Sequence, residues 1–155
     1  MGELACKDFK EQKSIADLLN YGPTLLGKIL LNLGMSYILC RNRFEAEKFI
    51  RRGLTYFDGS LNEKIFYRKK LYEAITLDGF GNVRATVGER ILEEIHEIAS
   101  EENNYEEMQY AVEKLIQLYT YFDMVDSVRV QEARLDRINA LLNYSEPSQY
   151  SDNVA

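Results

Sequence analysis

The stretch LNLGMSYILCRNRFEAEKFIRRGL, residues 31–54, decides how this chain folds. Its first half is almost entirely apolar, whereas its second half interleaves apolar residues with arginine and glutamate. Apolar residues at spacings of three and four lie on one stripe of an α-helix. The stretch therefore predicts two helices, over residues 23–40 and 43–57. The first helix is apolar around its whole circumference, so we expect every side of it to pack against other residues.

The rest of the chain has the same helical periodicity and no convincing strand pattern. Helices are expected over residues 4–19, 23–40, 43–57, 61–77, 82–100, 105–122 and 125–142. Pro23 suits the first turn of its helix, and the two glycines of DGFGN (78–82) are expected to supply positive φ for a sharp reversal. Because short connections make neighbouring helices antiparallel, the expected fold is all-α with about seven antiparallel helices.

Length and composition indicate one domain with a sizeable core, since the chain has 155 residues of which 46% are hydrophobic and 28% charged. We expect that domain over residues 1–143 and a flexible C-terminal tail over 144–155, where helical periodicity ends. No apolar stretch reaches the roughly 20 residues that a membrane span needs, and no basic-then-apolar leader opens the chain. Two cysteines are too few for a disulfide scaffold, and Cys40 is expected to be a buried thiol. These features indicate a reducing, cytoplasmic setting.

The charged residues are unevenly distributed along the chain. The formal net charge is −6, which argues against a surface built for nucleic-acid phosphates. Residues 41–70 hold nine lysines and arginines against four acidic residues (net +5), whereas residues 71–113 hold two against eleven (net −9). The basic stretch could bind an acidic partner segment, or it could be an ordinary solvated face. The candidate residues for such binding are Arg51, Arg52, Arg68, Lys69 and Lys70.

Seven residues of the opening stretch and its surroundings follow the pattern of a 34-residue helical repeat: Leu30, Leu33, Gly34, Tyr37, Ala46, Ile50 and Gly53. The small residues let two helices approach closely, and the large ones fill the space beside them. The pattern resembles a tetratricopeptide (TPR) repeat over residues 27–60 and, more loosely, over 89–122. Residues 61–88 are out of register, and pairing the last six predicted helices as three hairpins of roughly 40 residues is an alternative. The resemblance implies TPR-like helical hairpins that form a short solenoid or right-handed superhelix.

The same resemblance implies a concave inner surface, and it more weakly extends to the helical-repeat receptor portion of bacterial peptide-sensing regulators. The residues of the 23–40 helix that would face this surface are Lys28, Leu31, Met35, Ile38 and Leu39. An apolar strip open to water is normally an interaction site. Three alternatives remain for what buries this strip: the 4–19 helix folded back over it, a protein or peptide partner, or a second copy of the chain in a homodimer. The expected function is a non-catalytic protein- or peptide-binding scaffold, adaptor or regulator without cofactors.

Two other function classes were weighed against the binding scaffold. Glu93 and His96 have the Glu-x-x-His spacing of di-iron bundles, but the chain has one histidine and so lacks the second such pair. A small metal-binding or enzymatic bundle centred on His96 is thus the first alternative. The second is a DNA-associated regulator, because residues 12–30 outline a helix-turn-helix. Its second helix, however, offers mainly Thr24 and Lys28 amid leucines rather than a polar reading face.

Overall fold

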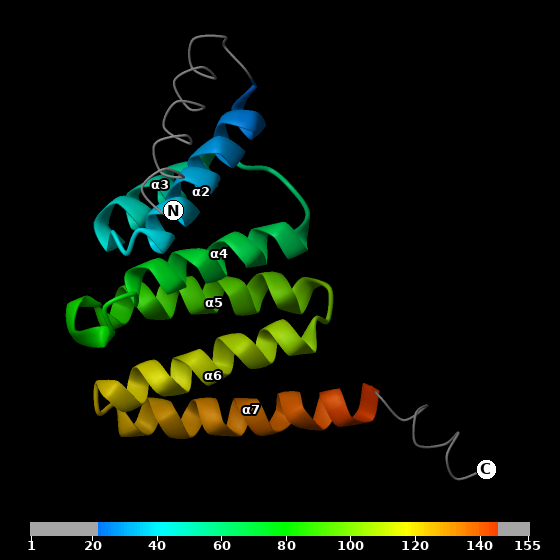
Figure 1. The fold of residues 1–155 in the computed structure, drawn as a ribbon. Coiled ribbons are helices and arrows are strands. Elements are labelled where there is room, and N and C mark those ends of the chain that lie inside the picture. The colour runs from blue at the N-terminus through cyan, green and yellow to red at the C-terminus, as the bar shows by residue number, and fades with distance from the viewer. Residues whose placement is uncertain (1–21, 146–155) are drawn as a thin grey trace. The chain divides into compact units, whose positions relative to one another are not determined.

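The computed structural model describes residues 22–145, and all of the regular structure in that range is helical. The α-helices are α2 (Pro23–Leu39), α3 (Arg43–Tyr56), α4 (Leu61–Ile75), α5 (Ala85–Glu101), α6 (Tyr105–Tyr121) and α7 (Val125–Ser145), with a short 3-10 helix η1 at Phe80–Asn82 (Figure 1). The predicted all-α class is confirmed, and six of the seven expected helices are present at nearly the expected bounds. The expected helix over 4–19 lies outside the described residues, as does most of the flexible tail expected over 144–155. Residues 144–145 of that tail belong to α7, so the tail prediction is wrong for these two residues.

Three of the turns between helices are built in the same way. Each places one non-glycine residue in the left-handed region: Arg41 (φ 56°), Asn103 (φ 53°) and Asp123 (φ 55°). In each turn the amide of the following residue donates to the carbonyl five residues back, at 2.9 Å; the pairs are Asn42 to Tyr37, Asn104 to Ala99, and Met124 to Tyr119. This is the hydrogen bond of the Schellman motif, which ends a helix and reverses the chain. Each turn of this kind makes the two helices that it joins antiparallel neighbours.

Helices α3, α4 and α6 begin at side-chain caps that the sequence supplies. Asn42 accepts a hydrogen bond from the Glu45 amide before α3, at 3.2 Å. Ser60 and Glu63 form a reciprocal capping box at the start of α4. These bonds satisfy amides that the first turn of a helix leaves without intrahelical partners. The caps explain why the predicted starts of α3 and α4 agree with the structure to the residue.

The break at DGFGN differs in detail from the prediction. Gly79 has φ 85° and precedes η1, but it is the one glycine of the described residues with positive φ. The expectation that both glycines supply positive φ is therefore wrong, because Gly81 lies within the 3-10 turn. That turn also delays the start of α5 from the expected residue 82 to Ala85.

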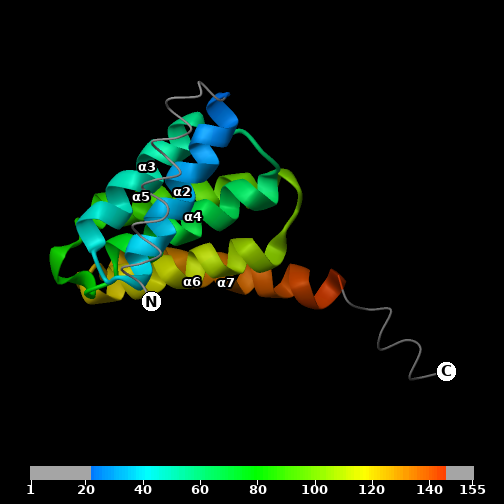
Figure 2. The ribbon, with the colours of Figure 1, turned by 45° about the horizontal axis from the view of Figure 1, so that its top comes forward.

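The chain groups into two compact units, residues 1–84 and 85–155. In unit 1, α2 packs along α3, and α3 packs on α4 (Figures 1 and 2). In unit 2, α6 lies between α5 and α7. The prediction of a single domain over residues 1–143 stays a prediction. Within the described range no helix combines the length and apolarity needed to cross a membrane.

Glycines set how closely α2 and α3 approach in unit 1. A Cβ atom added at Gly34 would lie 2.5 Å from Ile50 Cγ1, and one added at Gly53 would lie 2.6 Å from Leu31 Cγ. Gly27 has backbone atoms of α3 and Phe57 at similar range. A side chain at any of these positions would push the two helices apart. The three glycines therefore fix the rotation of α2 about its own axis.

Unit 2 has its own apolar core between its three helices. Fully buried residues of α5 and α6 supply most of it: Leu92, Ile95, Ala99, Ala111, Val112, Leu115 and Leu118. From α7, Ile138 and the polar Gln131 are buried one helical repeat of seven residues apart. The seven-residue spacing means that α7 turns one face toward the core and the opposite face away from it.

Candidate binding surface

The predicted strip on α2 is divided between the core and the surface. Lys28 and Leu39 are exposed and Met35 is half-buried, whereas Leu31 and Ile38 are buried. Leu31 packs against Gly53 of α3. Leu31 and Ile38 are therefore not open to water, and the contact of Leu31 with Gly53 assigns Leu31 to the α2–α3 interface. The partner-binding role of the strip stays a prediction.

The predicted basic patch is spread over two helices. Arg51 and Arg52 are exposed on α3, and Arg51 Nε lies 3.0 Å from Glu47 Oε2. Arg68, Lys69 and Lys70 are half-buried on α4. An exposed ion pair of this kind contributes at most about 1 kcal/mol and is easily exchanged for another. The α3 arginines are consequently the more accessible part of the patch.

The α4 cations are already engaged within the chain. Arg68 donates to the Lys64 carbonyl at 3.2 Å. The Lys70 ammonium lies 3.1 Å from Glu73 Oε2 and 5.5 Å from the centre of the Phe66 ring. A cation over an aromatic face is stabilised by the ring. These contacts make Arg68 and Lys70 weaker candidates for a partner than the prediction supposed.

Two exposed apolar side chains at the α2–α3 turn were not predicted as a site together. Leu39, the last residue of α2, is 73% exposed, and Phe44 in the first turn of α3 is 72% exposed. Because the Schellman turn at 40–42 reverses the chain, both residues lie at one corner of unit 1. The signal was present in the sequence: Phe44 falls opposite the apolar stripe of Ala46 and Ile50 on α3. A phenylalanine on the outer face of a helix has no core role.

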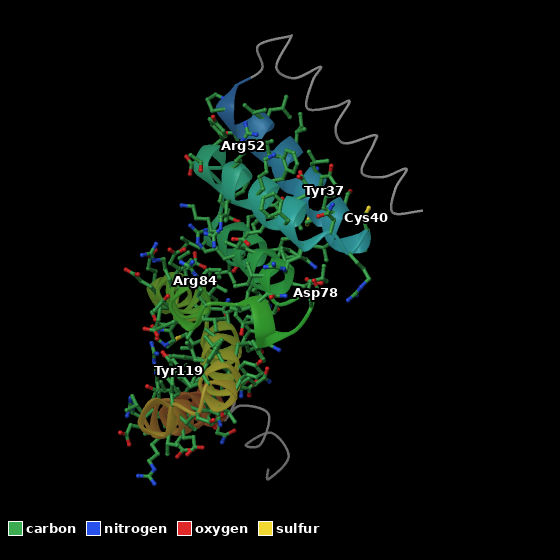
Figure 3. All side chains as sticks on the ribbon, turned by 90° about the vertical axis from the view of Figure 1, so that its left-hand side faces the viewer. Tyr37, Cys40, Arg52, Asp78, Arg84 and Tyr119 are labelled. Atoms are coloured by element: carbon green, nitrogen blue, oxygen red, sulfur yellow. The ribbon has the colours of Figure 1, made fainter. Side chains whose placement is uncertain are left out.

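The outer face of α3 continues from this corner. Phe44, Lys48, Arg51 and Arg52 follow one another at positions i, i+4, i+7 and i+8, a spacing that puts them on one side of a helix. All four are exposed. Over the whole of α3, four lysines and arginines stand against two glutamates, a net charge of +2. We call this surface, Leu39, Phe44, Lys48, Arg51 and Arg52, the basic apolar face; Arg52 is labelled in Figure 3.

Cys40, the residue that follows α2, differs from its prediction. It is half-buried and disulfide-bonded, and its sulfur lies at the edge of α2 in Figure 3. The other cysteine of the chain, Cys6, lies outside the described residues. The prediction of a buried thiol at Cys40 is therefore wrong. The cytoplasmic setting stays a prediction.

His96 on α5 belongs to a polar network with α7 rather than to an open site. The Arg134 guanidinium donates to Glu93 through both terminal nitrogens, at 2.9 and 3.2 Å, and its Nη2 lies 2.8 Å from His96 Nδ1. The guanidinium thus occupies the place between Glu93 and His96 that a metal ion would need. Burial and the positive charge of Arg134 lower the pKa of His96, against a smaller opposing effect of Glu93. The ring is held neutral, so Nδ1 can accept the hydrogen bond.

Tyr119 of α6 adds to the same polar region of unit 2. Burial, followed by the charge of Glu89 and a hydrogen bond to it, raises the pKa of Tyr119 to about 12. The phenol is thus a stable donor at neutral pH rather than a proton acceptor. Among the described residues no group of three or more histidine, cysteine or acidic side chains is placed to hold a metal ion.

The helix-turn-helix alternative falls partly outside the described residues, since its first helix would precede residue 22. Of its second helix, Thr24 and Lys28 are exposed as expected, alongside Leu25. The chain matches no protein-family model, no curated protein and no solved structure. The TPR resemblance therefore rests on the residue pattern alone and stays a prediction.

Proposed function

We propose that this chain is a non-catalytic binding scaffold whose unit 1 holds an acidic protein or peptide segment on the basic apolar face. The observation that carries the proposal is Phe44, 72% exposed on the same helical face as Lys48, Arg51 and Arg52. An exposed aromatic side chain on the same helical face as two arginines has the composition of an interface centre. If the outer face of α3 were only in contact with water, the exposed Phe44 side chain would have no role there.

The chemistry of the face specifies the partner. Carboxylates of the partner would pair with Arg51 and Arg52, and an apolar side chain would cover Phe44 and Leu39. Arginine forms bidentate hydrogen bonds with carboxylates, which adds geometric selectivity to the charge attraction. The partner is thus a segment in which acidic residues flank an aromatic or aliphatic one, as on an amphipathic helix.

The scaffold reading also agrees with how unit 2 uses its polar groups. His96 Nδ1, Glu93 and Arg134 are hydrogen-bonded to one another at 2.8–3.2 Å, which supports a structural role for the single histidine of the chain. A general acid or base must reach the substrate proton with a free nitrogen or oxygen atom. The binding function therefore takes precedence over the enzymatic alternative.

A selection from a displayed random-peptide library on the immobilised full chain tests the proposal. Enriched peptides should be acidic with one or two large apolar residues. They should lose binding to the variant Phe44→Ala with Arg51→Glu, and keep it for the matched surface variant Arg90→Glu in unit 2. Enrichment of peptides without acidic residues, or equal binding to all three proteins, would overturn the proposal.

A further inference from the structure

The exposed large apolar residues of unit 2 all lie along one of its described helices or directly before it. They lie on α7, on the last residue of α6 and in the turn between them: Tyr121, Met124, Val125, Val130, Leu141 and Tyr144. Val130 is 62% exposed and Tyr144 is 82% exposed. On the side of α7 away from α6, unit 2 has no further described helix (Figures 1 and 2). An exposed apolar set concentrated on one helix marks an interaction surface.

The outer side of α7 has the pattern of a helix–helix seam. Its exposed residues follow one another at alternating spacings of four and three: Asp126, Val130, Ala133, Arg137, Ala140 and Tyr144. This is the heptad spacing at which one helix contacts another along its whole length. The small residues Ala133 and Ala140 allow the partner helix to approach closely. We call these six residues the α7 seam.

We propose that the α7 seam binds the same seam of a second copy of this chain, with the two helices antiparallel. A twofold axis that passes between residues 131 and 132 sets Val130 against the partner's Ala133. The same axis sets Asp126 against the partner's Arg137. Each contact occurs twice, as in any isologous dimer. One register thus satisfies the apolar and the charged positions of the seam together.

The residues beside the seam support the same register. Arg129 and Asp136 are exposed and flank it on one side, where oppositely charged pairs form between the helices of a coiled coil. In the antiparallel register Arg129 approaches the partner's Asp136. Within the described part of the chain neither these two nor Asp126 and Arg137 form an ion pair. Their charges are therefore available to a second copy.

The same antiparallel arrangement also buries the apolar residues at the ends of the seam. Tyr144 and Leu141 extend beyond the twofold axis toward the start of the partner helix. That region carries exposed apolar residues of its own, Tyr121, Met124 and Val125. A purely acidic or purely basic foreign segment would instead bring a like charge against Asp126 or Arg137. The seam is complementary to itself, which favours a second copy over such a partner.

The test is sedimentation of the full chain from micromolar to millimolar concentration, with charge reversal and charge exchange on α7. Asp126→Arg and Arg137→Glu each place like charges opposite each other at two symmetric contacts. Each should weaken the dimer about tenfold or more. The double variant exchanges the two charges and should restore the dimer. Val130→Glu should abolish it, and Arg90→Glu on α5 should leave it unchanged.

All of these positions are exposed, so circular dichroism should report the same helix content for every variant. A monomer at every concentration would overturn the proposal. A dimer that persists in Val130→Glu and in both single charge reversals would also overturn it. The same holds if the double variant dimerises more weakly than either single variant. Because the seam lies in unit 2, this inference does not rest on the function proposed for unit 1.

Discussion

Replacing Gly27 by alanine tests the close packing of α2 on α3 that orients the whole of unit 1. A Cβ atom at this position would lie 2.9 Å from the Phe57 amide nitrogen, 3.1 Å from the Gly53 carbonyl oxygen and 3.1 Å from Phe57 Cα. All three are backbone atoms, so no change of rotamer relieves the contact. The two helices must separate to admit one methyl group.

Two opposing terms decide the sign of the effect. Alanine is favoured over glycine within a helix by about 1 kcal/mol. Overpacking a closed interface costs about 1–3 kcal/mol, and contact with three backbone atoms places this site at the upper end. The net loss should be about 2 kcal/mol. For a chain of this size, that lowers the midpoint of thermal unfolding by roughly 4–8 °C.

Thermal and urea unfolding of Gly27→Ala measure this difference, with Gly22→Ala as the matched control. The Cβ of the control would meet nothing within 4 Å. Because Gly22 is the N-cap of α2 and alanine caps less well than glycine, the control should lose at most about 1 kcal/mol. A Gly27→Ala protein as stable as the natural chain, or more stable, would refute the reasoning. It would mean that helix propensity decides and that α2 does not lie this close to α3.

Three further predictions concern protons and caps. Because the folded state holds His96 neutral with a lowered pKa, the unfolded chain binds its proton first. Stability should therefore fall as pH drops from about 6.5 toward the lowered pKa, and His96→Gln should flatten this part of the urea-midpoint profile. Tyrosine absorbance should show one phenol titrating near pH 12, which Tyr119→Phe should remove. Ser60→Ala should lower the free energy of unfolding by about 1 kcal/mol, measured by thermal unfolding. Because hydrogen bonds from Ser60 lower the pKa of Glu63, an NMR titration of the variant should show a higher pKa for Glu63.

Local signals in the sequence account for most of the fold. Helix periodicity, Pro23 at the first turn of α2, and the Asn42 and Ser60 caps act within a few residues of one another, so the helix bounds could be predicted closely. The repeat pattern also identified Gly34 and Ala46 as the small residues that allow close approach, and Gly34 lies against Ile50 of α3 in the structure. The left-handed turn at Arg41 was not, because nothing in that residue type favours positive φ.

The face that α2 turns outward depended on information that the repeat pattern did not supply. Gly27 packs on the backbone of α3 as Gly34 does, and Leu31 packs on Gly53 of α3. The pattern assigned a register to Gly34 but gave no role to Gly27. The contact of Gly27 with α3 therefore placed Leu31 in the core, where the repeat pattern had expected an open surface.

Side-chain contacts between residues far apart in the chain could not be predicted from the sequence. Arg134 lies 38 residues from His96, and the choice of this partner depends on how α7 packs in unit 2. The exposure of Phe44 could have been found, since it lies opposite the apolar stripe of α3. The charge pattern of α3 does not indicate this exposure, whereas the position of Phe44 relative to Ala46 and Ile50 does.

The most direct test of the binding function is a calorimetric titration of one selected acidic peptide into the full chain at low and high salt. Binding should weaken with salt, because exposed charges are screened. The dissociation constant should rise at least about tenfold when Arg51 and Arg52 are both changed to glutamate, or when Phe44 is changed to alanine. An unchanged dissociation constant in both variants would contradict the assignment of the basic apolar face as the binding surface.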